Sequence, residues 1–356
     1  MEGLEMKIEN SFWQGKRVLI TGHTGFKGSW LTFWLLRMGA SITGISLKPD
    51  TNPSLFELLN FSKDINCCIC DINNYTELSK IVDKYSPEII FHFAAQPLVR
   101  RSYREPLLTM STNIMGTVNL LESIRKQNNT KVVVMITTDK VYANESNFYP
   151  YRETDPLGGY DPYSASKAAS EIVIASYRDS FLKAQGIAIA SARAGNVIGG
   201  GDWSEDRLIP DAIRAWTNNL TLEIRHPNAT RPWQHVLEPL DGYLKLAKKL
   251  WEDPHLAGPY NFGPDLNNLI SVGEIAENAK NVFGFGAIKY ANSDGDYHEA
   301  NYLALENFKA SKLIGVSPKW NLQETINRTI DWYIAHYAGV NSRSLCEKDI
   351  TAFENN

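Results

Sequence analysis

The sequence predicts an α/β protein built on a Rossmann-type doubly wound parallel sheet, followed by a smaller C-terminal lobe. Two observations carry this prediction. Short apolar runs alternate with segments whose apolar residues recur every three or four positions, which is the strand and helix rhythm of a parallel sheet. After about Asn196 that rhythm gives way to loops rich in Gly, Pro and Trp, and loops of this kind typically carry binding groups.

The predicted elements follow in chain order. Six strands are expected at RVLITG, ASITGISL, INCCICD, EIIFHFAA, KVVVMITT and IAIASARAGNV. Helices are expected at GSWLTFWLLRMG, YTELSKIVDKY, TNIMGTVNLLESIRKQ and YSASKAASEIVIASYRDSF. Because parallel neighbours need a helical crossover, and because continuous apolar runs mark strands buried on both faces, these elements favour a doubly wound sheet.

The chain divides accordingly into two lobes and a tail. We expect a dinucleotide-binding Rossmann domain over residues 12–195, to which about 234–260 returns through the helix LEPLDGYLKLAKKLWED. The second lobe, which would bind substrate, is expected over 196–345, and 346–356 is expected to be a loose tail.

Composition excludes several classes of function. A net charge of −4 gives no general reason to bind nucleic acid. No targeting segment and no run of about 18 apolar residues is found, so we expect a cytoplasmic protein without a membrane partner. The four cysteines are too few for a disulfide framework, and the CCIC run is expected to be a buried strand, so we expect no metal site.

A glycine-rich loop joins the first strand to the first helix in VLITGHTGFKGSWL. Its pattern is G-x-x-G-x-x-G. Glycines there allow a tight turn and close backbone approach, and the helix N-terminus offers free N–H groups to a pyrophosphate. The sequence therefore predicts a dinucleotide site, with candidate residues Gly22, His23, Gly25, Phe26, Lys27 and Gly28.

The choice between NAD and NADP is open from these residues. About twenty positions past the loop, Lys48 and Asp50 compete for the place that contacts the ribose hydroxyl. Asp71, at the end of the CCICD strand, is either an adenine contact or a turn former.

Two pairs of residues carry candidate chemistry. Tyr163 and Lys167 in DPYSASKAASE lie on one face of a helix, where an ammonium favours the phenolate. In TTDKVYANE, Asp139 precedes Lys140 directly. Adjacent residues on a strand point to opposite faces, so both can reach one substrate only if the strand ends by Thr138.

The glycine loop, Thr138 and the Tyr163/Lys167 pair resemble the extended short-chain dehydrogenase/reductase family over about residues 12–335. Longer blocks are similar to the sugar-nucleotide 4,6-dehydratases, with CDP-glucose as the expected substrate: GHTGFKGSWL, FHFAAQPLVRRSY, TTDKVY, ARAGNVIGGGDW, RPWQHVLEPL and HEANYLALE. The resemblance implies NAD as a recycled cofactor, with Ala94 and Gln96 among its contacts.

The resemblance also implies a role for each catalytic candidate. Tyr163 would take the proton of the sugar's 4-hydroxyl, Lys167 would hold the nicotinamide ribose and lower the tyrosine pKa, and Thr138 would bond to O4. Asp139 would be the acid that protonates the leaving O6. Lys140 stands where relatives commonly carry Glu, so it is either the C5 base or a salt-bridge partner.

The substrate would be a nucleotide sugar. By resemblance its site is lined by Asn196, Arg207, Arg231 and either His298 or Glu299. Arg193 is either a binding or a structural residue, and Trp203 and Trp233 either stack on a base or pack within the lobe.

The helices MSTNIMGTVNLLESIRKQ and YSASKAASEIVIASYRDSF are too apolar for a free surface. By resemblance, we expect them to pack against their copies in a homodimer or homotetramer. The rival functions are another sugar-nucleotide enzyme (a dTDP- or GDP-hexose 4,6-dehydratase or a 4-epimerase) and a regulatory protein that has lost catalysis.

Overall fold

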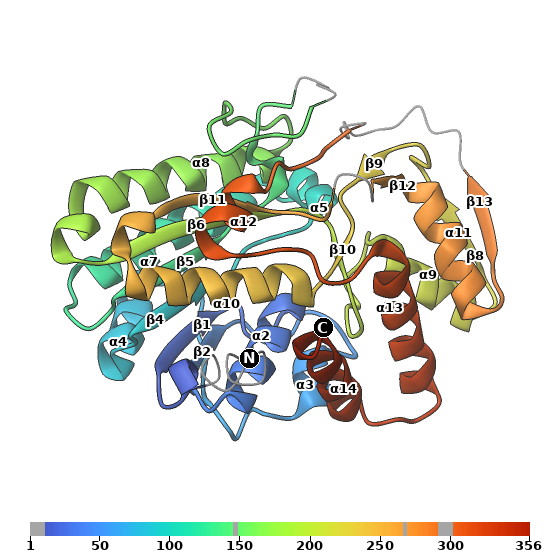
Figure 1. Cartoon of the computed structure of the whole chain (residues 1–356), viewed down its shortest axis with the longest axis horizontal. Helices are drawn as coiled ribbons and strands as arrows, with labels where there is room; N and C mark the ends of the chain where they lie inside the picture. The colour runs from blue at the N-terminus through green and yellow to red at the C-terminus, as the bar shows by residue number, and fades with distance from the viewer. Residues whose placement is uncertain (1–10, 145–148, 266–268, 291–301) are drawn as a thin grey trace.

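The computed structural model describes residues 11–144, 149–265, 269–290 and 302–356. A parallel sheet with helices on both faces forms the larger lobe, and a smaller lobe of helices and short strands lies beside it (Figure 1). The predicted fold class is therefore confirmed.

The strands of the central sheet are all parallel. Within the described residues the sheet has seven strands in the order β11-β6-β5-β4-β1-β2-β3. Their bounds are β1 (Arg17–Thr21), β2 (Ser41–Ser46), β3 (Asn66–Ile69), β4 (Ile89–His92), β5 (Val132–Ile136), β6 (Ala188–Ala194) and β11 (Gly258–Phe262). The strand order reverses between β1 and β4, and ligands bind at such a switch point, outside the carboxyl ends of the strands.

Helices cover both faces of the sheet. Helices α2 (Phe26–Arg37) and α10 (Leu237–Glu252) pack with the first hydrophobic cluster on one face. On the other face lie α4 (Tyr75–Tyr85), α7 (Gly116–Arg125) and α8 (Pro162–Tyr177). Strands buried from both sides explain why their sequences are continuous apolar runs.

Short helices connect these layers. They are α3 (Leu55–Leu59), α5 (Val99–Arg104), α6 (Pro106–Met110) and α12 (Phe308–Ile314). A π-helical turn over Ser111–Met115 joins α6 to α7.

The smaller lobe is built around α9 (Leu208–Thr217) and α11 (Val272–Phe283). Short strands pair within it or link it to the larger lobe: β7 (Val197–Ile198) with β10 (Gln234–His235), β8 (Thr221–Ile224) with β13 (Ala287–Tyr290), and β9 (Thr230–Arg231) with β12 (Ile270–Ser271). Helix α13 (Leu322–Tyr337) packs against α11.

The prediction of a loose C-terminal tail is wrong. Residues Ser342–Glu354 form helix α14, which begins at an Asn341 cap. Cys346, Ile350 and Phe353 lie at helical spacing on one face and are fully buried. Helix α14 contacts α3 and α13, so the chain end belongs to the fold (Figure 1).

Two strand predictions also need correction. The sequence GPYNF is one of the Gly- and Pro-rich stretches after Asn196 that were expected to be loops, but it forms β11 at the edge of the sheet, where it pairs with β6. The CCIC run does form a strand, but β3 is the opposite edge of the sheet, and Cys67 is exposed there.

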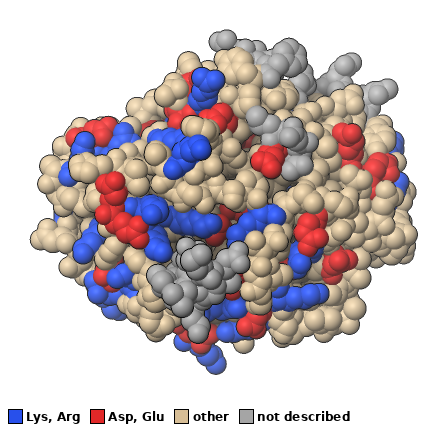
Figure 2. Space-filling model, in the orientation of Figure 1, with Lys and Arg blue, Asp and Glu red and all other residues tan. Residues whose placement is uncertain are grey.

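Charges of both signs are interspersed on the face of the molecule in Figure 2. Among the described residues, no helix has the length and apolar character needed to cross a membrane.

Candidate active site

A deep cleft opens at the carboxyl ends of β1, β4 and β5, between the two lobes. It is lined at one end by the glycine loop and at the other by residues of the smaller lobe. The sheet's switch point forms its floor, as expected for a dinucleotide site.

The glycine loop has the geometry that a phosphate site needs. Gly22 has φ +76°, and a Cβ there would lie 2.8 Å from the backbone nitrogen of Ala94. A Cβ on Gly28 would lie 2.1 Å from the carbonyl oxygen of Gly22. Gly25 is exposed at the N-terminus of α2, and no side chain caps that helix end. The free N–H groups and the helix dipole therefore face the cleft.

The other candidates for cofactor contacts fall into two groups. Lys48, Asp50, Asp71, Ala94 and Gln96 all line the cleft. The Asp71 carboxylate also accepts the backbone N–H of Asn73, so the residue forms a turn as well. The His23 side chain, in contrast, is buried away from the cleft, against Phe56 and Cys67. His23 can therefore contact a cofactor only through its backbone.

The pair Asp139 and Lys140 lies on a turn, not on a strand. Strand β5 ends at Ile136, and Thr138 caps a 3₁₀ turn over Asp139–Val141. We call residues Thr138–Val141 the acid–base turn. Because the strand has ended, the adjacent acid and base both line the cleft, which meets the condition set by the sequence.

The Asp139 carboxylate is almost fully buried. Its Oδ1 accepts the Thr138 hydroxyl at 2.9 Å and lies 3.6 Å from the Lys140 ammonium. Its Oδ2 is directed toward Gly195, where an added Cβ would lie 3.1 Å away. Within the described residues Oδ2 finds no hydrogen-bond partner. A buried polar oxygen of this kind is suited to a ligand hydroxyl.

Helix α8 brings Tyr163 and Lys167 to the same place. The Lys167 ammonium donates to the Ile136 carbonyl at 2.9 Å, directly before the acid–base turn. Tyr163 shares a side-chain hydrogen bond with Thr138. The structure therefore joins the two predicted residue pairs in one site.

Burial controls the ionisation of this cluster. The pKa of Tyr163 is raised to about 12, chiefly by burial; the Thr138 hydrogen bond and Arg207 lower it, and the Asp139 charge raises it. Burial lowers the pKa of Lys167 to about 8, against the effect of Glu171. The predicted lowering of the tyrosine pKa by Lys167 is thus not found, because burial of the phenol outweighs the effect of the nearby cation, Arg207.

Lys27 lies at the junction of the glycine loop and this cluster. Its ammonium donates to the Tyr243 hydroxyl at 3.4 Å. Burial, with Arg207 and Lys167, lowers the pKa of Lys27 to about 7, and Asp139 raises it. The amine is therefore partly neutral near neutral pH.

The structure also shows a residue, Asn113, that stabilises the cleft wall and that the sequence did not predict. Asn113, in the π-helical turn, accepts the backbone N–H of Gln96 at 2.8 Å and donates to the Ser166 hydroxyl at 2.8 Å. It fixes the loop after β4 to the helix that carries Tyr163. π-Helical turns often occur at functional sites, but they have no simple sequence signature.

Three of the substrate-site candidates belong to the same cleft. Asn196, Arg207 and Arg231 line it, and Arg207 pairs with Asp202 at 2.7 Å. His298 and Glu299 lie outside the described residues. Trp203 lines the cleft but packs edge-on against Trp332 and Tyr333, which favours the packing alternative.

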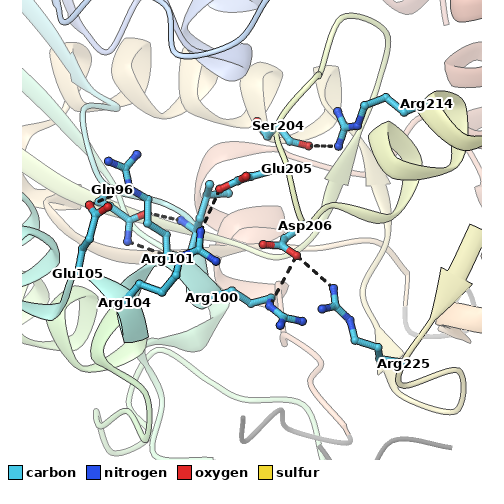
Figure 3. A network of polar contacts seen from close by, with 11 residues as sticks. Gln96, Arg100, Arg101, Arg104, Glu105, Ser204, Glu205, Asp206, Arg214 and Arg225 are labelled. Atoms are coloured by element: carbon cyan, nitrogen blue, oxygen red, sulfur yellow. Dashed lines mark hydrogen bonds and ion pairs between the residues drawn. The ribbon is translucent and has the colours of Figure 1, made fainter. Parts of the chain in front are cut away.

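Ion pairs connect the two lobes at the cleft rim (Figure 3). Arg100 on α5 lies 3.6 Å from Asp206, which also pairs with Arg225 at 3.2 Å. Arg104 pairs with Glu205 at 3.1 Å. Several guanidinium groups thus face one end of the cleft, where anionic groups of a ligand would be favoured.

No group of three or more His, Cys, Asp or Glu side chains in the described part of the chain is arranged to hold a metal ion.

Comparisons with known proteins identify the family of this chain. The sequence matches the family described as GDP-mannose 4,6 dehydratase over residues 19–329. It is 45% identical over 352 residues to a CDP-glucose 4,6-dehydratase of Salmonella typhimurium, covering 97% of this chain and 98% of that protein. The chain therefore belongs to the GDP-mannose 4,6 dehydratase family, and the resemblance to sugar-nucleotide dehydratases is confirmed.

Solved structures share the fold. A Bacillus anthracis dTDP-glucose 4,6-dehydratase in complex with NAD aligns with a TM-score of 0.75 at 22% identity, covering 91% of this chain and 98% of that one. A Thermus thermophilus UDP-glucose 4-epimerase in complex with NAD aligns with a TM-score of 0.78 at 24% identity, covering 89% and 99%.

Proposed function

We propose that this protein is an NAD-dependent hydro-lyase that converts CDP-D-glucose to CDP-4-keto-6-deoxy-D-glucose and water. The relative named CDP-glucose 4,6-dehydratase, at 45% identity over nearly the full chain, supports the substrate. The single observation that carries the chemistry is the buried Asp139 carboxylate beside Tyr163 in one cleft. An elimination needs an acid for the leaving oxygen, whereas a 4-epimerase has no water to eliminate.

The cleft fits NAD. The uncapped N-terminus of α2 and the close approach permitted by Gly28 suit a pyrophosphate. Lys48 and Asp50 both line the cleft and are the two candidates for the ribose hydroxyl. NAD, when bound, would accept a hydride from C4 of the sugar and return it to C6, so that no net redox change occurs. Lys167 would hold the nicotinamide ribose.

The protein's own side chains would move the protons. Tyr163 would take the 4-hydroxyl proton, with Thr138 bonded to O4. The resulting 4-ketone acidifies C5, and Asp139 would protonate O6 as water leaves. Lys140 is the candidate base for the C5 proton, since it lies on the same turn.

Cations that line the cleft would hold the diphosphate. Arg231 and Arg207 are the candidates, and Asn196 and His298 would complete the nucleotide site. We propose that the product enters dideoxyhexose biosynthesis for an O-antigen-type polysaccharide, and that the protein acts in the cytoplasm.

We also propose that the protein forms a homodimer, or a homotetramer made of two such dimers. Apolar side chains stand exposed on neighbouring helices: Leu107 on α6 is 83% exposed and Ile172 on α8 is 62% exposed. Exposed apolar surface of this kind marks protein interfaces. Light scattering of the purified protein tests this proposal, and a monomer at micromolar concentration would contradict it.

The activity is tested by incubating the protein and NAD with CDP-, dTDP-, GDP- and UDP-hexoses. We expect CDP-glucose alone to lose one water, as seen by mass spectrometry and by the absorbance of the alkali-treated 4-keto-6-deoxy product. A product of unchanged mass would indicate an epimerase, and preference for another base would reassign the nucleotide.

A further inference from the structure

A buried ion pair joins helix α8 to strand β6 behind the candidate site. The Arg193 guanidinium lies 2.8 Å from the Glu171 carboxylate, and each side chain is only 3% exposed. The residues that line the cleft include neither of them. The pair therefore does not line the substrate cleft, and its role depends on the residues to which it is hydrogen-bonded.

Glu171 holds the first end of the acid–base turn. Thr137, which directly precedes the turn, donates its hydroxyl to Glu171 Oε1 at 2.5 Å. Ser191 on β6 donates to Oε2 at 2.6 Å. Burial opposes the charge, but hydrogen bonds from Arg193, Ser191 and Thr137 outweigh it and lower the pKa of Glu171. The carboxylate is thus ionised and accepts both from the residue that follows β5 and from β6.

Arg193 holds the other end of the same turn. Its Nη1 donates to the hydroxyl of Tyr142, the residue that directly follows the turn, at 2.9 Å. The Tyr142 hydroxyl in turn donates to Asn261 on β11 at 2.6 Å. One ion pair therefore clamps both ends of the segment that carries Asp139 and Lys140.

The clamp also connects to the residues of the hydride step. Glu171 lies one helical turn after Lys167 and two turns after Tyr163 on α8. We propose that Glu171 and Arg193 are positioning residues that keep the acid–base turn in register with Tyr163 and Lys167, an inference that rests on the proposed function. The ion pair would thus fix the residues of the oxidation step, Tyr163 and Lys167, relative to Asp139, the acid of the elimination step.

Stability alone does not account for such a pair. A buried ion pair loses so much hydration that well-packed apolar residues in its place are often neutral or stabilising. A displacement of about 1 Å among reacting groups, however, can lower a rate by about 10²-fold. The pair would therefore serve to keep the reacting groups in position, and not to stabilise the fold.

The test replaces the pair with apolar residues of similar size, in the full-length protein with NAD and CDP-glucose. For Glu171→Leu/Arg193→Met we expect near-normal thermal unfolding, little change in KM and a kcat lowered by about 10²-fold. The matched control is Arg328→Met/Asp349→Leu, which removes a partly buried pair between α13 and α14, away from the cleft, and should keep its kcat. A folded double variant with wild-type kcat would overturn the proposal.

Milder variants cover the case in which the double variant fails to fold. Thr137→Val and Tyr142→Phe each remove one hydroxyl from one end of the clamp. Each should lower kcat with KM little changed. Wild-type kcat in both would overturn the proposal.

A second readout does not depend on the reaction. Amide hydrogen exchange of residues 138–142, measured without ligands, should be faster in the clamp variants than in the control, because the segment opens more readily. If the wild-type protein does not dehydrate CDP-glucose, the proposed function fails, yet faster exchange would still support the clamp. Unchanged exchange in all clamp variants would refute it.

Discussion

Asp139→Asn gives the sharpest test of the elimination step. The substitution keeps the shape of a side chain that is 1% exposed, and the amide oxygen can still accept the Thr138 hydroxyl. What is lost is the carboxyl group that would carry a proton to O6, at the oxygen that faces Gly195 and has no hydrogen-bond partner among the described residues. General acid catalysis contributes about 10²–10⁴-fold, which corresponds to about 2.7–5.4 kcal/mol of activation free energy.

The expected result is a block between the two hydride transfers. Because Tyr163 keeps its hydroxyl, oxidation at C4 should proceed, and reduced cofactor should accumulate on the enzyme while formation of the 4-keto-6-deoxy product slows by at least about 10²-fold. Rapid mixing, followed by the absorbance of the reduced nicotinamide, measures the first step. Mass spectrometry of the quenched mixture measures the second.

The electrostatics supply a second signature. The Asp139 charge raises the pKa of Tyr163, so Asp139→Asn should lower it, and the rate of the first oxidation should reach its plateau at a lower pH. Loss of the first hydride transfer in this variant would refute the reasoning and move the carboxylate into the oxidation step. Full-speed dehydration would make Asp139 structural.

Four further outcomes are expected. Tyr163→Phe should lower kcat by about 10²–10⁴-fold while substrate affinity, measured by calorimetry, is kept; retention of more than about a tenth of kcat would contradict the role. Lys140→Met should stop solvent deuterium from entering the product at C5, as read by mass spectrometry, and unchanged incorporation would show that another group is the base. Glu171→Gln should lower the pKa of Lys167 below its present value of about 8, because the carboxylate raises it, so activity should fall at a lower pH on the alkaline side; an unmoved pH–rate profile would contradict this coupling. Phe353→Ala should lower the free energy of unfolding by about 3–5 kcal/mol in urea, because the ring is fully buried, and a loss below about 1 kcal/mol would mean that α14 contributes little.

Local rules explain what the sequence predicted well. The glycine loop was predictable because the positive φ of Gly22 and the close approach at Gly28 are backbone constraints that only glycine meets easily. The pairing of Tyr163 with Lys167 follows from helical spacing alone. Both depend on neighbours in the chain, so they are visible without the fold.

Most of the wrong predictions concern segments whose structure depends on contacts with residues distant in the sequence. The β11 sequence GPYNF has turn residues and few apolar ones, and it becomes a strand because β6 offers it a partner. The His23 side chain turns toward the sheet, which no local pattern indicates. For α14 a signal was present, since Cys346, Ile350 and Phe353 recur at helical spacing after the Asn341 cap.

The environment of Lys140 bears directly on the base at C5. A lysine acts as a base when burial or a nearby cation favours its neutral form. The Lys140 side chain is 29% exposed and lies 3.6 Å from an anion, the Asp139 carboxylate. Lys27 in the same cleft has the opposite environment, with burial and two cations that lower its pKa to about 7. If deuterium still enters at C5 in Lys140→Met, Lys27 is therefore the next residue to substitute, because burial and the two cations favour its neutral form.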